Sequence, residues 1–260
     1  MKNFLIALIL CALAQRSYAQ TFMPAKEAGE EVCVNKKDGK VRCRRNFTVE
    51  RVTREGKIVY KINLTGFGDY DKYTDIRLQF VSEMEERGDF LFTLWSTQTI
   101  RDKNGDLIVE YRKDYDYPAK KIYYRAAGKG GKTIAQKTFL IKGRVVDDVG
   151  LGCFLKTIVA HIENKDYRHF YLLSSEPAMY EINVKKIGDE DFISSLGKIA
   201  AIKIRLIPDF GILTGITGAV VPPTYLWFGK DAPYDDLAYE GLETGLGSAH
   251  VVITTTRNKQ

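Results

Sequence analysis

Apolar and polar side chains alternate with a period of two along much of the chain. Over residues 58–64, 107–117 and 202–206, one set of alternate positions is largely apolar and the other largely polar or charged. An antiparallel sheet with one buried and one solvated face produces this pattern. Asn104-Gly105-Asp106 has the composition of a hairpin turn and follows a strand predicted at 90–99. The pattern predicts an all-β fold.

One segment follows a helical period instead. After Asp147-Asp148, apolar residues recur at the spacing i, i+4, i+7, i+8 and i+11, at Leu151, Leu155, Ile158, Val159 and Ile162. We expect an aspartate to cap the start of this helix. A single amphipathic helix needs an apolar surface to cover. The prediction is therefore a strongly curved antiparallel sheet, or half-barrel, with one helix packed on its concave face. Residues 190–195 also fit a short helical turn.

The first 19 residues have the three-part layout of a secretory signal peptide. Lys2 precedes an apolar run from Phe4 to Ala14, and the segment ends in the small-residue site Ser17-Tyr18-Ala19. The run is too short to cross a bilayer of about 30 Å as a helix. We expect cleavage after Ala19 and an exported, periplasmic protein.

The expected organisation is a signal peptide (1–19), an N-terminal hairpin (20–45) and one curved sheet domain (46–260). Residues 210–228 are the longest later apolar candidate, but their Gly, Pro and Thr content argues against a membrane span. The net charge of +6 falls to about +4 once Lys2 and Arg16 leave with the leader. Acidic and basic residues are interspersed, so the charge pattern does not favour a nucleic-acid partner.

Three cysteines follow the leader. Cys33 and Cys43 flank an Asp-Gly turn signal, so an oxidising compartment favours a disulfide that clips this hairpin. Cys153 lies in an apolar segment and is expected to be a buried thiol. A metal site would need more ligands, and the three histidines lie far away in the sequence. We therefore predict no metal and no cofactor.

Aromatic residues supply the candidate ligand contacts. Tyr225 and Trp227 share one face of a strand whose other face is also apolar. Such a strand is either buried on both faces, or buried on one face and in contact with a ligand on the other, and the same two alternatives apply to Trp95. Plain core packing is the competing interpretation of each. Together with Leu155 and Val159 of the predicted helix, these three aromatic residues form the predicted ligand-binding set.

The chain carries no recognisable catalytic pattern. It has no Gly-x-Ser-x-Gly elbow, and its histidines have no triad spacing. Glu240 and Glu243 are the most suggestive carboxylates, but residues three apart on a strand point to opposite faces. The prediction is a non-enzyme. A carboxylate-based hydrolase that uses these residues or the Asp69–Asp75 loop is the alternative.

Six short elements in order resemble an exported bacterial family, domain of unknown function 3108. They are Phe80–Met84, Asp114–Tyr117, Asp147-Asp148 with the following helix, Gly197–Ile204, Pro223–Phe228 and Gly245–Ser248. The resemblance implies a curved sheet with helical cover, similar in outline to the half-barrel of periplasmic lipoprotein carriers. By analogy it implies an envelope protein that binds a lipid or acyl chain, and it carries over no catalytic residues. The alternative is an assembly protein that binds an envelope partner through a sheet edge.

Overall fold

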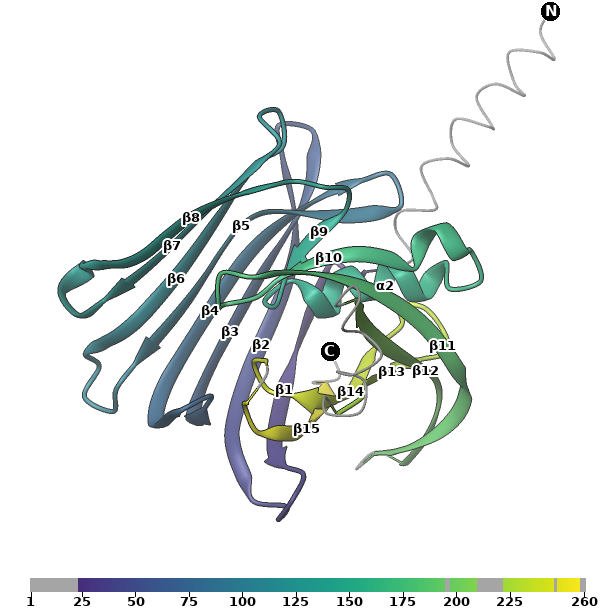
Figure 1. The fold of residues 1–260 in the computed structure, drawn as a ribbon. Coiled ribbons are helices and arrows are strands. Elements are labelled where there is room, and N and C mark those ends of the chain that lie inside the picture. The colour runs from purple at the N-terminus through teal and green to yellow at the C-terminus, as the bar shows by residue number, and fades with distance from the viewer. Residues whose placement is uncertain (1–22, 195–196, 210–221, 246, 258–260) are drawn as a thin grey trace, which may run out of the picture.

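A single large sheet makes up most of the molecule (Figure 1). The computed structural model describes residues 23–194, 197–209, 222–245 and 247–257, so the predicted signal peptide lies outside the described residues. The described elements, in chain order, are β1 (Lys26–Asn35), β2 (Val41–Arg54), β3 (Lys57–Tyr70), β4 (Tyr73–Arg87), β5 (Phe90–Arg101), β6 (Leu107–Asp116), β7 (Lys121–Gly128), η1 (Lys129–Gly131), β8 (Thr133–Leu140), β9 (Val145–Asp147), α2 (Leu151–Ala160), η2 (Lys165–Tyr167), β10 (His169–Leu173), β11 (Met179–Ser194), β12 (Gly197–Asp209), β13 (Thr224–Gly229), β14 (Asp236–Leu242) and β15 (His250–Arg257).

The strands form one meander of 15 in the order β8-β7-β6-β5-β4-β3-β2-β1-β15-β14-β13-β12-β11-β10-β9. Strands that are consecutive in the sequence are neighbours in the sheet, except that β8 and β9 form its two ends. β1 pairs with β15 in the middle of the sheet. All pairs are antiparallel apart from β9 with β10. The prediction of a curved antiparallel sheet with one α-helix is confirmed. No helix in the described part of the chain has the length and apolarity needed to cross a membrane.

The segments with period-two alternation are strands in the structure, as predicted. Residues 58–64 belong to β3, and the predicted hairpin is β5 and β6, with Gly105 at φ +93° in the turn. The helical alternative for residues 190–195 is wrong for the described residues 190–194. They belong to β11, where Glu190 pairs with Ala201 and Ser194 with Gly197 of β12. Backbone pairing along the whole of a long hairpin outweighs a local helical signal here.

The helix lies where it was predicted, but its start differs. α2 ends at Ala160 and is preceded by Gly150, which has no side chain that could cap the helix. The expectation that an aspartate caps the helix is therefore wrong. Asp147 instead accepts a hydrogen bond from the Gly150 amide (3.0 Å) one turn earlier. Its carboxylate is held there because Asp147 ends β9 and is buried against the sheet.

The helix lies in the concavity of the sheet (Figure 1). It lies between two arms of the sheet, strands β1–β8 and strands β9–β15, which are joined by the β1–β15 pair. Its buried residues, including Phe154, Leu155 and Ile158, share one core with residues of β2–β5 and of β11–β13. β9, at one end of the strand order, contacts β5, which is the fourth strand from the other end. The sheet thus curls back on itself without closing into a barrel by backbone pairing.

The hairpin predicted for residues 20–45 is continuous with the rest of the sheet. β1 pairs with β15 on one side, and β2 runs on to Arg54 and pairs with β3 along its length. Cys33 and Cys43 therefore lie near the middle of the strand order.

Candidate ligand-binding cavity

A cavity of about 350 Å³ lies between the two arms of the sheet and the start of α2. This volume falls within the roughly 300–1,000 Å³ typical of small-molecule sites. Most of its wall is apolar. The apolar side chains that line it are Phe47, Val49, Ile62, Leu64, Phe80, Val149, Leu151, Cys153, Leu172, Ile182, Leu206, Pro208, Leu226, Ala238, Leu242 and Ile253. They come from both arms, so the curvature of the sheet creates the cavity.

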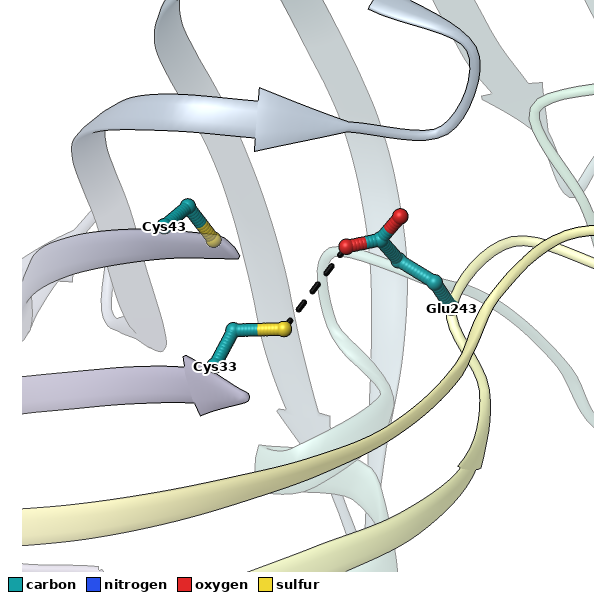
Figure 2. Close-up of side chains that lie close together, drawn as sticks. All are labelled: Cys33, Cys43 and Glu243. Atoms are coloured by element: carbon teal, nitrogen blue, oxygen red, sulfur yellow. Dashed lines mark hydrogen bonds between the residues drawn. The ribbon is translucent and has the colours of Figure 1, made fainter. Parts of the chain in front are cut away.

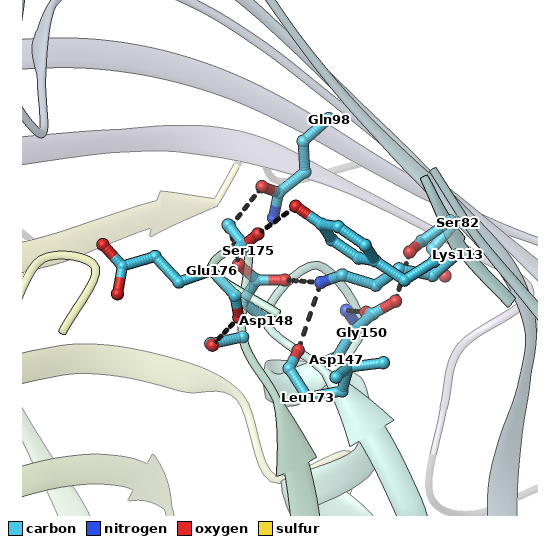
Figure 3. Close-up of polar contacts among 12 residues, drawn as sticks. Ser82, Gln98, Lys113, Asp147, Asp148, Gly150, Leu173, Ser175 and Glu176 are labelled. Atoms are coloured by element: carbon cyan, nitrogen blue, oxygen red, sulfur yellow. Dashed lines mark hydrogen bonds and ion pairs between the residues drawn. The ribbon is translucent and has the colours of Figure 1, made fainter. Parts of the chain in front are cut away.

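A network of polar side chains lies beside the cavity, where β9 and the segment after β10 meet β5 and β6 (Figure 3). Two of its members, Gln98 and Asp148, line the cavity. We call this network the polar seam. Its members are Ser96, Gln98, Lys113, Tyr115, Asp147, Asp148 and Ser175. Ser96 donates a hydrogen bond to Asp147, and the Ser175 hydroxyl bonds to Gln98 (2.6 Å). Because β9 and β10 share no backbone pairing with β5 and β6, these side chains supply polar contacts where the strands meet.

Lys113 is the central cation of the polar seam. Its ammonium group is 2.7 Å from an Asp148 carboxylate oxygen, and it donates to the Leu173 carbonyl at 3.1 Å. The Lys113 side chain is 1% exposed. Lys113 therefore connects β6 to the residue that follows β9 and to the last residue of β10. It also neutralises the Asp148 carboxylate, which would otherwise lack a charged partner.

The pKa values of the two aspartates of the polar seam are shifted in opposite directions. Burial raises the pKa of Asp147, which is only partly offset by the charge of Lys113. Burial also acts to raise the pKa of Asp148, but the charge of Lys113 and hydrogen bonds from Lys113 and Ser175 outweigh it and lower that pKa. Asp148 is therefore the ionised partner of Lys113.

A second buried ion cluster lies where α2 meets β1 and the C-terminal strands. The Lys156 ammonium, fully buried, is 2.8 Å from a Glu27 carboxylate oxygen. Arg257 also contacts Glu27, at 2.6 Å, and reaches Asp235 at 2.7 Å. Asp236 lines the cavity next to this cluster, 3.9 Å from Lys156.

Cys33 and Cys43 lie together beside Glu243 (Figure 2). The two cysteines are direct partners in the β1–β2 register, and both are 1% exposed. The donor atoms of these three residues lie within 4.8 Å of one another. Glu243, however, already accepts hydrogen bonds from Arg42 (3.0 and 3.2 Å) and from the Asp71 amide (2.7 Å). A structural zinc ion prefers four ligands, so the cluster fits a metal poorly.

The disulfide between Cys33 and Cys43 stays a prediction, because both are thiols in this structure. Paired residues of adjacent antiparallel strands are roughly 4.5–5.5 Å apart at Cα, which a disulfide accepts. In protein purified from the envelope, alkylation under denaturing conditions before reduction should label one thiol per mature chain, that of Cys153. A Cys153→Ser control should take up no label. Labelling of three thiols would contradict the pairing.

Cys153 is buried as predicted, at 7% exposure. Burial raises the pKa of its thiol to about 12, so the reactive thiolate is disfavoured at neutral pH.

The structure separates the residues of the predicted ligand-binding set. Leu155 and Val159 are in the core, at 0% and 2% exposure. Tyr225 and Trp227 lie on the face of β13 opposite Leu226 and Phe228, where the Lys203 ammonium is 5.1 and 4.6 Å from their rings. Trp95 is half-buried, with the Arg112 guanidinium 5.8 Å from its ring. None of the five is among the residues that line the cavity. Their ligand-binding role stays a prediction.

The carboxylates considered for hydrolysis are dispersed. Glu243 faces the cavity, whereas Glu240 pairs with Lys36 and does not line it. Asp69 accepts a hydrogen bond from the Asp75 amide (3.1 Å) within its loop. The expectation of a non-enzyme is untested by this arrangement.

The edge-binding alternative is also untested. β8 and β9 are the end strands of the described sheet, and β8 carries Ile134 and Leu140, each 61% exposed.

Residues that the sequence predictions missed include Lys113, Glu27 and Asp236. Lys113 could have been identified from the sequence, because it occupies the same alternating positions as Val109, Tyr111 and Tyr115 on the apolar face of β6. A lysine at such a position predicts a buried charge with a partner. Asp236 carried no such signal.

Comparisons with known proteins show a similarity of fold and no similarity of sequence to a known family. No family model matches the chain, so membership of the domain of unknown function 3108 family is not shown. No curated protein matches its sequence. Among solved structures, a β-barrel-like protein of domain of unknown function 1849 from Brucella abortus is similar at a TM-score of 0.52 and 8% identity, over 90% of this chain and 97% of that one. A protein with a YmcC-like fold from Bacteroides fragilis, described as exported, aligns at a TM-score of 0.34 and 11% identity, over 91% and 97% of the two chains. The chain thus has a fold similar to that of the Brucella protein, at an identity that shows the fold alone.

Proposed function

We propose that this chain is an exported binding protein that holds the hydrocarbon chain of a lipid or other amphiphile in the cavity between the sheet and α2. The observation that carries the proposal is the cavity of about 350 Å³ with a mainly apolar wall. An apolar chain that leaves water for such a site gains roughly 25 cal/mol per Å² of buried surface. Export rests on the layout of the first 19 residues.

The position of the cavity supports a carrier. Its wall includes Val149, Leu151 and Gly152, which begin the crossover from β9 into α2. The crossover is attached to β5 and β6 through side chains of the polar seam. Rearrangement of side chains and the helix start could admit a ligand without breaking the pairing of the central strands.

Filling the cavity should weaken ligand binding. Leu64 is half-buried on β3 and lines the cavity, so Leu64→Trp should occupy ligand space and weaken binding of 1-dodecanol by about tenfold or more. Titration below the micellar or solubility limit, read by native mass spectrometry and calorimetry, measures the change. The matched control is Leu140→Trp on β8, where the side chain is 61% exposed and the affinity should not change. Equal affinity of Leu64→Trp and the parent protein would place the ligand outside this cavity. Absence of binding by the parent protein would contradict the proposed function.

A further inference from the structure

Acidic residues dominate the charged part of the cavity wall. Among the described residues, five carboxylates line it, at Glu27, Glu31, Asp148, Asp236 and Glu243, whereas only Arg45 lines it with a cationic side chain. Four of the five carboxylates contact a cation directly. These contacts are Glu27–Lys156 at 2.8 Å, Glu31–Arg45 at 2.8 Å, Asp148–Lys113 at 2.7 Å and Glu243–Arg42 at 3.0 Å.

Asp236 is the exception. Its nearest cation in the described chain is the Lys156 ammonium at 3.9 Å, and that group already makes two hydrogen bonds to Glu27. Among the described residues, none donates a hydrogen bond to the Asp236 side chain. The side chain is 30% exposed and lines the cavity. It is therefore a partly buried carboxylate with free acceptor positions next to an apolar chamber.

The start of α2 leaves room in front of this carboxylate. A Cβ atom at Gly152 would lie 3.0 Å from Asp236 Oδ2, closer than ordinary van der Waals contact. The glycine thus keeps open a space that a larger residue would fill.

The ionised side chain of Asp236 also lowers the stability of the folded protein at neutral pH. Burial raises its pKa to about 6, with Glu27 and Glu31 acting in the same direction and Lys156 and Arg257 opposing them. A carboxyl group whose folded pKa lies above its unfolded value favours folding at low pH, and this contribution is lost as the pH rises through the folded value. A cationic ligand group beside Asp236 would offset that cost.

We propose that Asp236 binds the head group of the ligand and that the cavity selects amphiphiles with an ammonium head over those with a carboxylate head. The inference rests on the proposed function, since the hydrocarbon chain would occupy the apolar part of the same cavity. An ammonium group can donate hydrogen bonds to the free oxygens of Asp236. A carboxylate head would meet like charges on the wall.

The test compares three probes that share one chain: dodecylammonium, 1-dodecanol and dodecanoate, each titrated by calorimetry below its micellar limit near pH 7.5. Dodecylammonium should bind about tenfold more tightly than dodecanoate, with dodecanol between them. Asp236→Asn should remove the preference for the ammonium and leave the affinity for dodecanol within about twofold. The matched control is Asp235→Asn, because Asp235 pairs with Arg257 and does not line the cavity.

The outcomes distinguish the two proposals. If none of the probes binds, the proposed function fails and the head-group inference fails with it. If all three bind the parent protein equally, or if Asp236→Asn keeps the preference, the cavity function stands and the role of Asp236 is overturned. Asp236→Asn should fold with an unchanged or higher Tm. If it does not fold, Gly152→Ala gives a second test, because the added methyl group should weaken the binding of dodecylammonium more than that of dodecanol.

The pH dependence gives an independent readout. The charged groups around Asp236 are Lys156 on α2, Glu27 and Glu31 on β1, and Arg257 on β15. Affinity for dodecylammonium should fall as the pH drops through about 6, because a protonated Asp236 carries no charge. Affinity for dodecanol should stay nearly constant over the same range. Parallel pH profiles for the two probes would overturn the assignment.

Discussion

Replacing Lys113 with methionine is expected to lower the free energy of unfolding by about 3–5 kcal/mol. The substitution keeps an unbranched side chain of similar length but removes the cation that contacts Asp148 and the Leu173 carbonyl. Asp148 and the carbonyl would then be left in the interior with fewer partners. The loss should lie towards the lower end of the range, because the Asp148 side chain is 30% exposed and retains some access to water.

The loss should depend on pH. In the parent protein the lowered pKa of Asp148 contributes stability above its unfolded pKa, and this contribution is lost as the pH falls through the folded value. Without Lys113, burial and neighbouring Asp147 would raise that pKa, so protonation would relieve the folded variant in acid. Denaturant unfolding should therefore show a smaller difference near pH 5 than near pH 8.

The matched control is Lys121→Met on neighbouring β7, where the lysine is exposed. It should change the free energy of unfolding by less than about 0.5 kcal/mol. Equal effects at the two lysines would contradict the role of the polar seam in holding the arms together.

Replacing Phe154 with alanine is expected to cost about 3–5 kcal/mol of stability. Phe154 is 1% exposed on α2, and its ring centroid is 5.1 Å from that of Phe170 and 6.3 Å from that of Phe90. These partners belong to β10 and β5, so the ring joins the helix to both arms of the sheet. Its removal would leave a cavity that the surrounding strands cannot easily fill.

Denaturant unfolding of Phe154→Ala measures this cost. Phe67→Ala serves as the control, since Phe67 is 54% exposed on β3 and should contribute about 1 kcal/mol or less. A loss below about 1 kcal/mol for Phe154→Ala would show that packing of α2 against the two arms contributes little to stability.

β6 shows both what residue alternation can predict and what it cannot. Alternation over residues 107–117 was enough to predict the strand and its buried face, because side chains on a strand alternate between faces whatever lies beyond them. The same alternation placed Lys113 on that face, yet its partners are 35 and 60 residues further along the chain. Local patterning shows that a charge is buried and does not show which group neutralises it.

The ligand-binding set shows a second limit. Tyr225 and Trp227 stand out in the sequence as large aromatic residues, but the curvature of the sheet turns Leu226 towards the cavity and these two away from it. Which face of a doubly apolar strand lines a cavity depends on the direction in which the whole sheet bends. That direction is a property of all 15 strands together.

The sequence by itself determined the strands, the hairpin turns, the single helix and the antiparallel class, because each depends on side-chain period and turn chemistry within a few residues. It also placed Cys33 and Cys43 opposite each other, since a short hairpin sets its own register. Only the tertiary structure decided that β1 and β15 meet in the middle of the sheet, that the arms are held together by the polar seam, and that Asp236 faces an apolar cavity. These features bring together residues as far apart as Glu27 and Arg257, and packing of the complete sheet around α2 determines which of them meet.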